Sequence, residues 1–548
     1  MLPQGKTLKE VSTKFAWKIP DRFNIGIACC DAFAVREPQR VALRKWVEGG
    51  APVETSYGEL KAASDKLAQY LQGCGLETGE RVAIILPQSV ETVVCHLAIY
   101  KAGLIAVPLA RLFATEALQY RLARAGARAI VTNADGLAKL MTIKLQLPEL
   151  AVMIVVGEED MHADAIRFSD ALAGDSANFV AADTGPETPA LIIFTSGTTG
   201  QAKGVLHAHR VLLGHVPGVQ FHHEFMPQPG DVAWTPADWA WAGGLLNILL
   251  PCLYLGVPVV HGGMERFNPH KAFQLLDDMK VANAFIPPTA LRLMKTVVRP
   301  SEHHRLHLRT IGSGGESLGR DTFEWVQQNL GITVNEFYGQ TECNLVLSSC
   351  ARLGVSRAGA IGKPVPGHEV AVIDKDGTVC APGERGEAAV KRPDPVMFLG
   401  YFGDDAATQN KFVGEWMTTG DQCVVDGDGY FHFIGRDDDI INSAGYRVGP
   451  GEIEDCLVSH PAVKLAAAVG KPDRLRTEIV KAYVVLVDGI VKNEALKQEI
   501  VLHVKARLAA NIYPREIEFV DEIPLTTTGK VIRRLFRERA RAEAASGD

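Results

Sequence analysis

The 548-residue sequence lacks the motifs that define several common classes of protein. None of its ten cysteines forms a C-x-x-C pair, so the spacing indicates neither a disulfide scaffold nor a thiolate metal site. A G-x-S-x-G elbow is absent, which argues against an α/β-hydrolase, and no G-x-G-x-x-G follows an expected strand, which argues against dinucleotide redox chemistry. The 57 Lys and Arg are fewer than the 64 Asp and Glu, and the net charge of −7 does not favour nucleic-acid binding.

Signals for export or for membrane insertion are also missing. The first twenty residues have no apolar segment and carry Glu10, so we expect a cytoplasmic protein whose thiols are reduced. An uncharged stretch at 239–260 is long enough to span a bilayer, but Pro251, Pro258 and Asn247 interrupt it. We therefore predict that this stretch forms a buried helix leading into a buried strand.

Apolar strands alternate with helical segments over much of the chain, which predicts an α/β protein with largely parallel sheets. The pattern changes near Gly435, after a region of short strands and turns. Downstream, one helix has an apolar residue at every fourth position from Leu496 to Leu508, which predicts a packed stripe. We expect a large N-terminal domain at 1–435, a connection at 436–438 and a small α+β domain at 439–548.

A loop rich in hydroxyl groups follows an apolar strand that ends at Phe194. Hydroxyl donors, glycines that let backbone N–H groups approach, and Lys203 suit a polyphosphate. The loop is not a Walker A motif, because Gln201 and Ala202 separate its last glycine from the lysine. Taken alone, a flexible surface turn explains it equally well. The loop consists of Thr195, Ser196, Gly197, Thr198, Thr199 and Gly200.

Six further motifs follow this loop in the sequence. They are Gly314-Gly315-Glu316, Glu336-Phe337-Tyr338-Gly339-Gln340-Thr341-Glu342, Thr418-Thr419-Gly420-Asp421, Gly435-Arg436-Asp437-Asp438, Ala444-Gly445-Tyr446-Arg447 and Pro524-Leu525-Thr526-Thr527-Thr528-Gly529-Lys530. In this order, over about residues 57–534, the chain resembles the adenylate-forming superfamily of acyl-CoA synthetases, luciferases and adenylation domains. It is most similar to the medium-chain acyl-CoA synthetases. The resemblance implies two βαβ-layered subdomains and a small β-barrel in the N-terminal domain, and a mobile C-terminal domain.

The resemblance implies that a carboxylate attacks the α-phosphate of ATP, giving an acyl-adenylate and pyrophosphate. At about 4 Å, two like charges repel by roughly 4 kcal/mol at an effective dielectric constant near 20, so the site needs cations. Lys530 is similar to the catalytic lysine of the family, which bridges the carboxylate and the phosphate. Glu342 is expected to bind Mg²⁺, Thr341 to contact the α-phosphate, and Arg447 to reach a phosphate.

The same resemblance assigns the remaining nucleotide contacts. Asp421, assisted by Arg436, is expected to accept hydrogen bonds from the ribose hydroxyls, and Lys203 with the hydroxyl loop to cover the β- and γ-phosphates. The residues expected near adenine and the neighbouring phosphate are Gly314, Gly315, Glu316, Glu336, Phe337, Tyr338, Gly339 and Gln340. Each residue also has an ordinary structural explanation: Asp421 as a turn cap, Arg436 as a partner of Asp437, and Lys530 as a solvated lysine.

A second half-reaction requires the lysine to leave and coenzyme A to enter. Members of the family pivot the small domain about a residue two positions beyond the arginine of the Gly-Arg pair, which here is Asp438. After this rotation the turn at Ala444, Gly445 and Tyr446 is expected to line a tunnel for pantetheine. Two basic residues match positions that meet the nucleotide end of coenzyme A in medium-chain relatives: Arg476 and Lys505.

The identity of the acid depends on the acyl pocket. Gly339 stands where acetyl-CoA synthetases have a tryptophan that closes this pocket, and Trp241 is followed by the small residues Ala242 and Gly243. We therefore expect a larger pocket and a short-to-medium-chain fatty acid of roughly four to ten carbons. An aromatic acid is the alternative. The sequence also leaves open an acyl transfer to a carrier protein, a non-catalytic nucleotide-binding protein, and a homo-oligomer.

Overall fold

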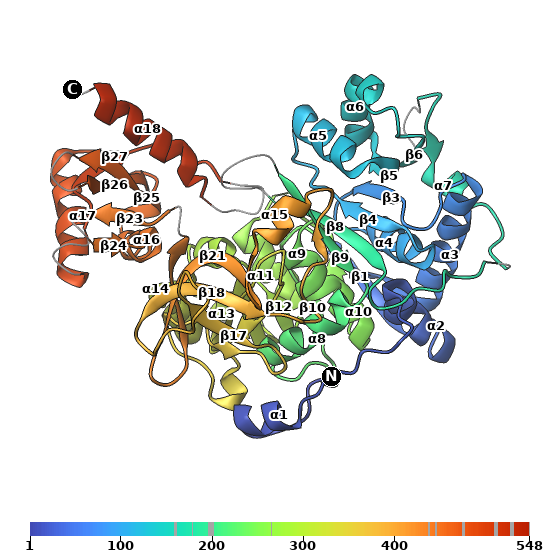
Figure 1. Cartoon of the computed structure of the whole chain (residues 1–548), viewed down its shortest axis with the longest axis horizontal. Helices are drawn as coiled ribbons and strands as arrows, with labels where there is room; N and C mark the ends of the chain where they lie inside the picture. The colour runs from blue at the N-terminus through green and yellow to red at the C-terminus, as the bar shows by residue number, and fades with distance from the viewer. Residues whose placement is uncertain are drawn as a thin grey trace.

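The computed structural model of the protein describes residues 1–157, 162–177, 179–195, 202–264, 266–436, 439–443, 446–473, 477–508, 513–525 and 531–546. Within these residues, four β-sheets and their helices build a large N-terminal domain and a smaller C-terminal domain (Figure 1). The C-terminal domain lies at the left of Figure 1, with α18 at its upper edge. The predicted fold class, mixed α/β with a large multi-sheet domain and a small second domain, is confirmed.

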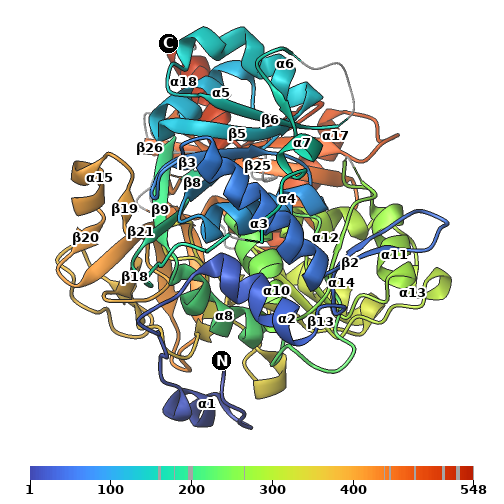
Figure 2. The same ribbon diagram turned by 90° about the vertical axis from the view of Figure 1, so that its right-hand side faces the viewer.

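The first sheet has eight strands in the order β19-β9-β8-β4-β3-β5-β6-β7. Alternate residues of β3 face opposite ways: Val82 packs in the core that contains α3 and α4, and Ala83 in the core that contains α5 and α6. Both faces of this mostly parallel sheet are therefore buried. Figure 2 shows α3 and α4 on the face turned to the viewer. The bounds are β3 Arg81–Ile85, β4 Ile105–Pro108, β5 Ala127–Asn133, β6 Val152–Val156, β7 Ile166–Arg167, β8 Pro189–Thr195, β9 Lys203–Ala208, β19 Gly400–Tyr401, α3 Tyr57–Gly73, α4 Val90–Lys101, α5 Thr115–Ala125 and α6 Ala134–Ile143.

The second sheet has nine strands in the order β16-β15-β14-β13-β12-β10-β11-β1-β2. Its central strands are parallel, so their carboxyl ends lie along one edge of the sheet. The bounds are β1 Val41–Lys45, β2 Val53–Ser56, β10 Ala233–Trp234, β11 Val259–His261, β12 Asn283–Phe285, β13 Thr310–Gly314, β14 Val334–Tyr338, β15 Leu347–Ser348, β16 Lys363–Pro364, α8 Val211–His222, α11 Pro269–Asp278, α12 Pro288–Met294 and α14 Arg320–Leu330.

The uncharged stretch at 239–260 is buried within this domain. It forms the short helix α9 (Ala242–Gly244), a π-helical turn at Leu245–Leu249, the helix α10 (Leu250–Leu255) and the start of β11. The prediction of a buried helix followed by a buried strand is confirmed. Among the described residues, every helix is too short or too polar to serve as a membrane span.

The third sheet is antiparallel and has five strands, in the region where a small β-barrel was expected. Its strands β21 and β22 pair so that Asp421 lies opposite Arg436. This pairing brings together two residues that the sequence placed in separate motifs. The bounds are β17 Val370–Ile373, β18 Arg385–Lys391, β20 Phe412–Val413, β21 Trp416–Val425 and β22 Phe431–Arg436.

The fourth sheet belongs to the C-terminal domain and has the order β24-β23-β26-β25, with β27 paired to β26. In α17, Ile500 and Val504 are fully buried, and Leu496 and Leu508 pack against the same core, so the predicted apolar stripe is confirmed. The bounds are β23 Ile441–Ser443, β24 Tyr446–Val448, β25 Val463–Asp473, β26 Thr477–Leu486, β27 Glu516–Phe519, α16 Pro450–Val458, α17 Glu494–Arg507 and α18 Arg533–Ser546.

Candidate active site

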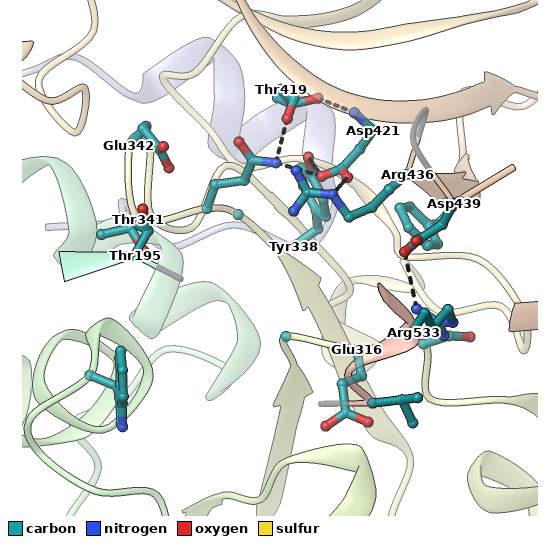
Figure 3. Close-up of a pocket in the computed structure, with 18 of the residues that line it drawn as sticks. Thr195, Glu316, Tyr338, Thr341, Glu342, Thr419, Asp421, Arg436, Asp439 and Arg533 are labelled. Atoms are coloured by element: carbon teal, nitrogen blue, oxygen red, sulfur yellow. Dashed lines mark hydrogen bonds and ion pairs between the residues drawn. The ribbon is translucent and has the colours of Figure 1, made fainter. Parts of the chain in front are cut away.

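A cavity of about 960 Å³ lies between the two domains and is lined by residues from both (Figure 3). The N-terminal domain contributes the carboxyl ends of β8 and β14, the turn that follows β13, and residues of β21 and β22. Gly314, at the end of β13, is not among the described residues that line the cavity. The C-terminal domain contributes α16 and the start of α18. Most of the predicted nucleotide motifs therefore meet at one place, although they are spread over more than half of the chain.

The phosphate side of the cavity lies where β8 ends and β9 begins. Thr195 and Lys203 are directly opposite each other in this antiparallel pair, so the hydroxyl loop connects two neighbouring strands. Both residues line the cavity. The Lys203 ammonium lies 4.8 Å from the centroid of the Tyr401 ring. The other loop residues, Ser196–Gly200, lie outside the described residues.

Glu342 is held by a tyrosine that the sequence motifs did not include. The Tyr401 hydroxyl donates a 2.6 Å hydrogen bond to Oε1 of Glu342, whose side chain is buried. Burial, together with the negative charge of Glu342, raises the pKa of Tyr401 well above its usual value, so the phenol stays protonated. The pairing of β19 with β9 places Tyr401 beside Val205, so that the same tyrosine contacts both Lys203 and Glu342.

The residues around Glu342 fit a magnesium ion. In the described part of the chain, no group of three or more His, Cys, Asp or Glu side chains is arranged to hold a metal by itself. Mg²⁺ does not need such a cage, because it usually takes one or two protein carboxylates and completes its shell with water and substrate phosphates. Glu342 and the neighbouring Thr341 hydroxyl line the cavity and supply oxygen atoms of this kind.

Asp421 is the centre of a hydrogen-bond network at the other end of the cavity (Figure 3). Its Oδ2 accepts 2.6 Å hydrogen bonds from the Tyr338 hydroxyl and from the side-chain amide of Gln340. Its Oδ1 lies 4.0 Å from Nε of Arg436. The carboxylate is 5% exposed, and burial together with its charge raises the pKa of Tyr338 well above the usual value. A fixed carboxyl acceptor of this kind suits two vicinal hydroxyl groups.

A third side of the cavity is formed by the turn after β13 and by β14. Glu316 accepts hydrogen bonds from Oγ1 of Thr289, at 2.8 Å, and from the guanidinium of Arg292, at 3.3 Å. Glu336 accepts a long hydrogen bond of 3.4 Å from the backbone N–H of Leu318. Burial raises the pKa of Glu336 to about 8, so this carboxyl group is mostly protonated at neutral pH and can donate a hydrogen bond.

Two aromatic side chains line the cavity: Trp241, which was expected in the acyl pocket, and Phe337, which was expected near the nucleotide. Phe285 packs against Phe337 with ring centroids 5.3 Å apart. A Cβ atom at Gly243 would lie 3.1 Å from the Phe285 ring. A side chain at position 243 would therefore press on Phe285, but Gly243 is not among the described residues that line the cavity, and its place in the acyl pocket stays a prediction. Ala242 is half-buried at the start of α9.

Gly339 lines the cavity, but its structural role differs from the one expected. A Cβ atom here would overlap the backbone carbonyl of Asn344. With this backbone no larger residue fits at position 339, and a side chain would point at the Asn344 backbone. Gly339 is thus required by the close approach of the Asn344 backbone, and the larger acyl pocket expected from the missing tryptophan stays a prediction.

The C-terminal domain brings the neighbours of Lys530 to the cavity. Val531 and Arg533 line it together with Lys203 and Glu342. Lys505 lies on α17, 5.3 Å from the ring of Tyr513, and is not among the described residues that line the cavity. Five of the predicted residues lie outside the described residues: Lys530, Asp438, Ala444, Gly445 and Arg476. Two more lie in β24 and have only their backbone described: Tyr446 and Arg447.

Asp439 connects the start of the C-terminal domain to the helix that follows Lys530. Its carboxylate pairs with Arg537 at 2.6 Å and with Arg533 at 3.4 Å. Arg533 also forms hydrogen bonds with both carboxylate oxygens of Glu454 on α16, at 2.9 and 2.5 Å. These contacts hold α16, α18 and the segment after residue 438 together as one unit.

The sequence motifs missed several residues that shape the site: Tyr401, Arg292, Asp439, Asp455 and Arg533. Arg533 follows Lys530 by three positions, and Asp439 follows the expected pivot directly, so closeness to a motif was the only available signal. Tyr401 stands in a Gly-Tyr-Phe-Gly segment that has no polar cluster to mark it.

Comparisons with known proteins agree with this geometry. The profile of the AMP-binding enzymes matches residues 30–402, and that of the AMP-binding enzyme C-terminal domain matches residues 452–530. The chain belongs to the AMP-binding enzyme family.

Two curated relatives and two solved structures illustrate the likeness. An uncharacterized acyl-CoA ligase of Bacillus subtilis, YtcI, is 33% identical over 91% of this chain and 93% of its own length. The human mitochondrial acyl-coenzyme A synthetase ACSM2B is 32% identical over 95% and 92%. An anthranilate CoA ligase, AuaEII, solved with anthranoyl-AMP, superposes with a TM-score of 0.88 at 28% identity, over 96% of this chain and 99% of its own. A Brucella canis acyl-CoA synthetase superposes with a TM-score of 0.75 at 32% identity, over 99% and 100%.

Proposed function

We propose that the protein ligates a carboxylic acid to coenzyme A in an ATP-dependent reaction that passes through an acyl-adenylate and releases AMP and pyrophosphate. One observation carries the proposal. A single cavity joins Lys203, Glu342 and Asp421 of the N-terminal domain to Val531 and Arg533, which follow Lys530 in the sequence. A carboxylate, a triphosphate and a ribose can meet there beside a delivered cation.

In the first half-reaction a carboxylate oxygen of the acid attacks the α-phosphorus of ATP. A new P–O bond forms to the acid, and the bond to pyrophosphate breaks. Lys530 bridges the two anions and offsets their repulsion of roughly 4 kcal/mol at about 4 Å. Lys203 faces the departing pyrophosphate. Glu342 and Thr341 hold Mg²⁺, which supplies positive charge to the triphosphate when bound.

The nucleoside is positioned by the other two sides of the cavity. Asp421, with one oxygen fixed by Tyr338 and Gln340, accepts hydrogen bonds from the ribose hydroxyls. Arg436, beside its other oxygen, assists this contact. Adenine lies between Tyr338 and the turn at Gly314–Glu316, near Glu336. Arg447 reaches a phosphate.

In the second half-reaction the sulfur of coenzyme A attacks the acyl carbonyl carbon, AMP leaves, and the thiol proton passes to solvent. The N-terminal domain at 1–435 and the C-terminal domain at 439–548 rotate about Asp438, in the connection at 436–438, to admit the thiol. Ala444, Gly445 and Tyr446 then line the pantetheine tunnel. Arg476 and Lys505 contact the nucleotide end of coenzyme A.

The substrate is a short-to-medium-chain fatty acid of roughly four to ten carbons, or an aromatic acid. The aromatic side chains of Trp241, Phe285 and Phe337 support the second candidate, because flat rings pack favourably against them. The likeness to an anthranilate CoA ligase and to a benzoate CoA ligase from Burkholderia xenovorans LB400 supports it as well.

The test is acid-dependent ATP–pyrophosphate exchange with fatty acids of two to about twelve carbons and with aryl acids, followed by AMP release with and without coenzyme A. We expect Lys530→Ala to lose nearly all exchange while it still binds ATP. Lys492→Ala, which removes an exposed lysine paired with Asp521, is the matched control and should remain active. Undiminished exchange by Lys530→Ala would contradict the proposal.

A further inference from the structure

The carboxylate of Asp455, on α16 of the C-terminal domain, makes polar contacts with the N-terminal domain. Its Oδ2 accepts a 3.0 Å hydrogen bond from the Ser317 hydroxyl, and its Oδ1 lies 3.5 Å from the guanidinium of Arg292. A Cβ atom at Gly319 would lie 3.0 Å from its Cγ, so the backbone approaches closely as well. We call Asp455, Ser317 and Arg292 the interdomain contact.

The interdomain contact is built on the turn that forms the adenine side of the cavity. Arg292 donates a 2.6 Å hydrogen bond to the Ser317 carbonyl and a 3.3 Å hydrogen bond to the Glu316 carboxylate. Arg292, Glu316, Ser317 and Asp455 all line the cavity. A movement of Asp455 therefore shifts residues of the proposed nucleotide site, and a bound nucleotide in turn acts on Asp455 through the same residues.

The C-terminal domain is oriented so that α16 and the start of α18 face the cavity. Val531 and Arg533 line the same cavity as Lys203 and Glu342. Asp455 makes its contacts with Ser317 and Arg292 in this orientation. Rotation of the domain moves α16, and these contacts then have to break.

We propose that Asp455 is a positioning residue that holds the C-terminal domain in the acid-activating orientation through Ser317 and Arg292, and that it must release them before thioester formation. The inference rests on the proposed function and adds a named contact to it. A residue that stabilises one of two domain orientations shifts their populations by its differential interaction energy. Removing it should slow the half-reaction that needs this orientation and spare the other.

Several charged groups face Asp455 and set its ionisation. Arg292 on α12 and Arg533 on α18 favour the charged form, whereas Glu454 on α16 opposes it; the charge of Asp455 in turn raises the pKa of Glu336 on β14. Arg292 also forms an ion pair with the Glu316 carboxylate. Burial is the largest effect and raises the pKa of Asp455 to about 6, against the opposing effect of Arg292. The contact with Arg292 should therefore weaken as the pH falls below about 6.

The first experiment measures the two half-reactions separately in Asp455→Ala. We expect ATP–pyrophosphate exchange to fall about fivefold to tenfold, because a hydrogen bond to a charged group is lost, while thioester formation from supplied acyl-adenylate is unchanged or faster. Asp455→Asn, which keeps an acceptor for Ser317, should fall less and should lose the decline of exchange below about pH 6. Asp488→Asn removes the same charge from an exposed site in the same domain and is the control.

An equal loss in both half-reactions, or unchanged exchange, would overturn the inference. Because Asp455→Ala could act by destabilising α16, Ser317→Ala removes the partner from the other domain and should show the same split. Thermal unfolding of each variant reports its folding directly.

A second experiment needs no turnover. Ser317→Cys and Asp455→Cys, combined with Cys74→Ser and Cys380→Ser to remove the cysteines that are not buried, are treated with dibromobimane, which fluoresces when it joins two thiols. We expect the double-cysteine variant to give more bimane fluorescence than either single-cysteine control, and ATP to raise the yield of the crosslink. The crosslinked enzyme should retain pyrophosphate exchange and lose at least about tenfold in thioester formation.

No crosslinking above the controls, or equal loss of both half-reactions on crosslinking, would overturn the inference. If the unmodified protein activates no acid but the crosslink forms and responds to ATP, the proposed function fails and the interdomain contact stands. The two failures are therefore distinguishable.

Discussion

Tyr401 and Glu342, 59 positions apart in the sequence, share a 2.6 Å hydrogen bond in which the phenol donates to the carboxylate. The tyrosine fixes one oxygen of the group that is proposed to bind Mg²⁺. Charge-assisted hydrogen bonds of this kind orient a ligand as well as stabilise it.

Tyr401→Phe is expected to raise the Mg²⁺ concentration for half-maximal pyrophosphate exchange by about tenfold, because second partners of metal ligands contribute on this scale. The maximal rate at saturating Mg²⁺ should change less. The measurement is a Mg²⁺ titration at fixed ATP, supported by Mn²⁺ binding in the presence of a non-hydrolysable ATP analogue. Tyr430→Phe, whose lost hydroxyl donates to the Gly354 carbonyl, is the control. A fall in the maximal rate alone would contradict the assignment.

Asp421→Asn is expected to raise the KM for ATP by about tenfold or more, because the amide cannot accept hydrogen bonds from Tyr338, Gln340 and a ribose together. Steady-state kinetics with varied ATP and saturating acid measure this change. Asp428→Asn alters an exposed carboxylate in the turn between β21 and β22 that pairs with Arg357, and it should leave the KM unchanged. Equal KM values in the two variants would remove Asp421 from the nucleotide site.

Gly243→Val is expected to change substrate choice, since its side chain would press on Phe285. We predict a fall of about tenfold or more in kcat/KM for the largest accepted acid and a small change for the shortest, because overpacking penalises bulk. Gly339→Ala should instead lose activity with every acid, since its Cβ overlaps the Asn344 backbone. Chain-length profiles of the two variants separate these effects. A uniform loss in Gly243→Val would place residue 243 outside the acyl pocket.

Acid is expected to destabilise the fold through buried histidines. Burial lowers the pKa of six of them to about 3 or 4: His96, His207, His209, His215, His223 and His261. Their pKa in the unfolded chain is about 6.5, so below that pH the unfolded state binds more protons. The stability is present above about pH 6.5 and is lost as the pH falls towards 4, by up to about 1.4 kcal/mol per pH unit for each histidine.

Glu336 acts in the opposite sense, because its raised pKa of about 8 lets the folded state keep a proton that the unfolded state releases. One such carboxyl group does not offset six histidines. Urea unfolding at pH 7, 6 and about 5 should show a falling midpoint with a constant slope against denaturant. His223→Gln, which can keep a hydrogen bond to Thr310, should reduce the decline. A midpoint that rises on acidification would contradict this account.

Much of the site could be predicted because its residues stand at the ends of recognisable strands. The apolar strand before the hydroxyl loop ends at Thr195 as β8, and Lys203 starts the next strand. Asp421 and Arg436 were assigned to one ribose, and their opposite positions on β21 and β22 agree with that assignment. In these cases a local pattern fixes the strand, and the strand places the side chain.

Other features depend on contacts that no local pattern encodes. The hydrogen bond between Ser317 and Asp455 joins residues 138 positions apart in two domains. Gly339 was interpreted from the side chain it lacks, but the constraint is the approach of the Asn344 backbone, which only the folded chain reveals. Residues that act through a distant partner carry no signature in their own segment.

The ion pairs of Asp439 with Arg533 and Arg537 fix the direction of α18 relative to the start of the C-terminal domain. A rotation of the C-terminal domain about the proposed pivot, residue 438, therefore displaces the C-terminal end of α18 by a large distance. A fluorophore on an exposed position of this helix, such as Arg534, paired with a second one on the N-terminal domain, would report each swing without touching the cavity. Energy transfer between the two fluorophores on single molecules would give the lifetime of each domain orientation between the two half-reactions.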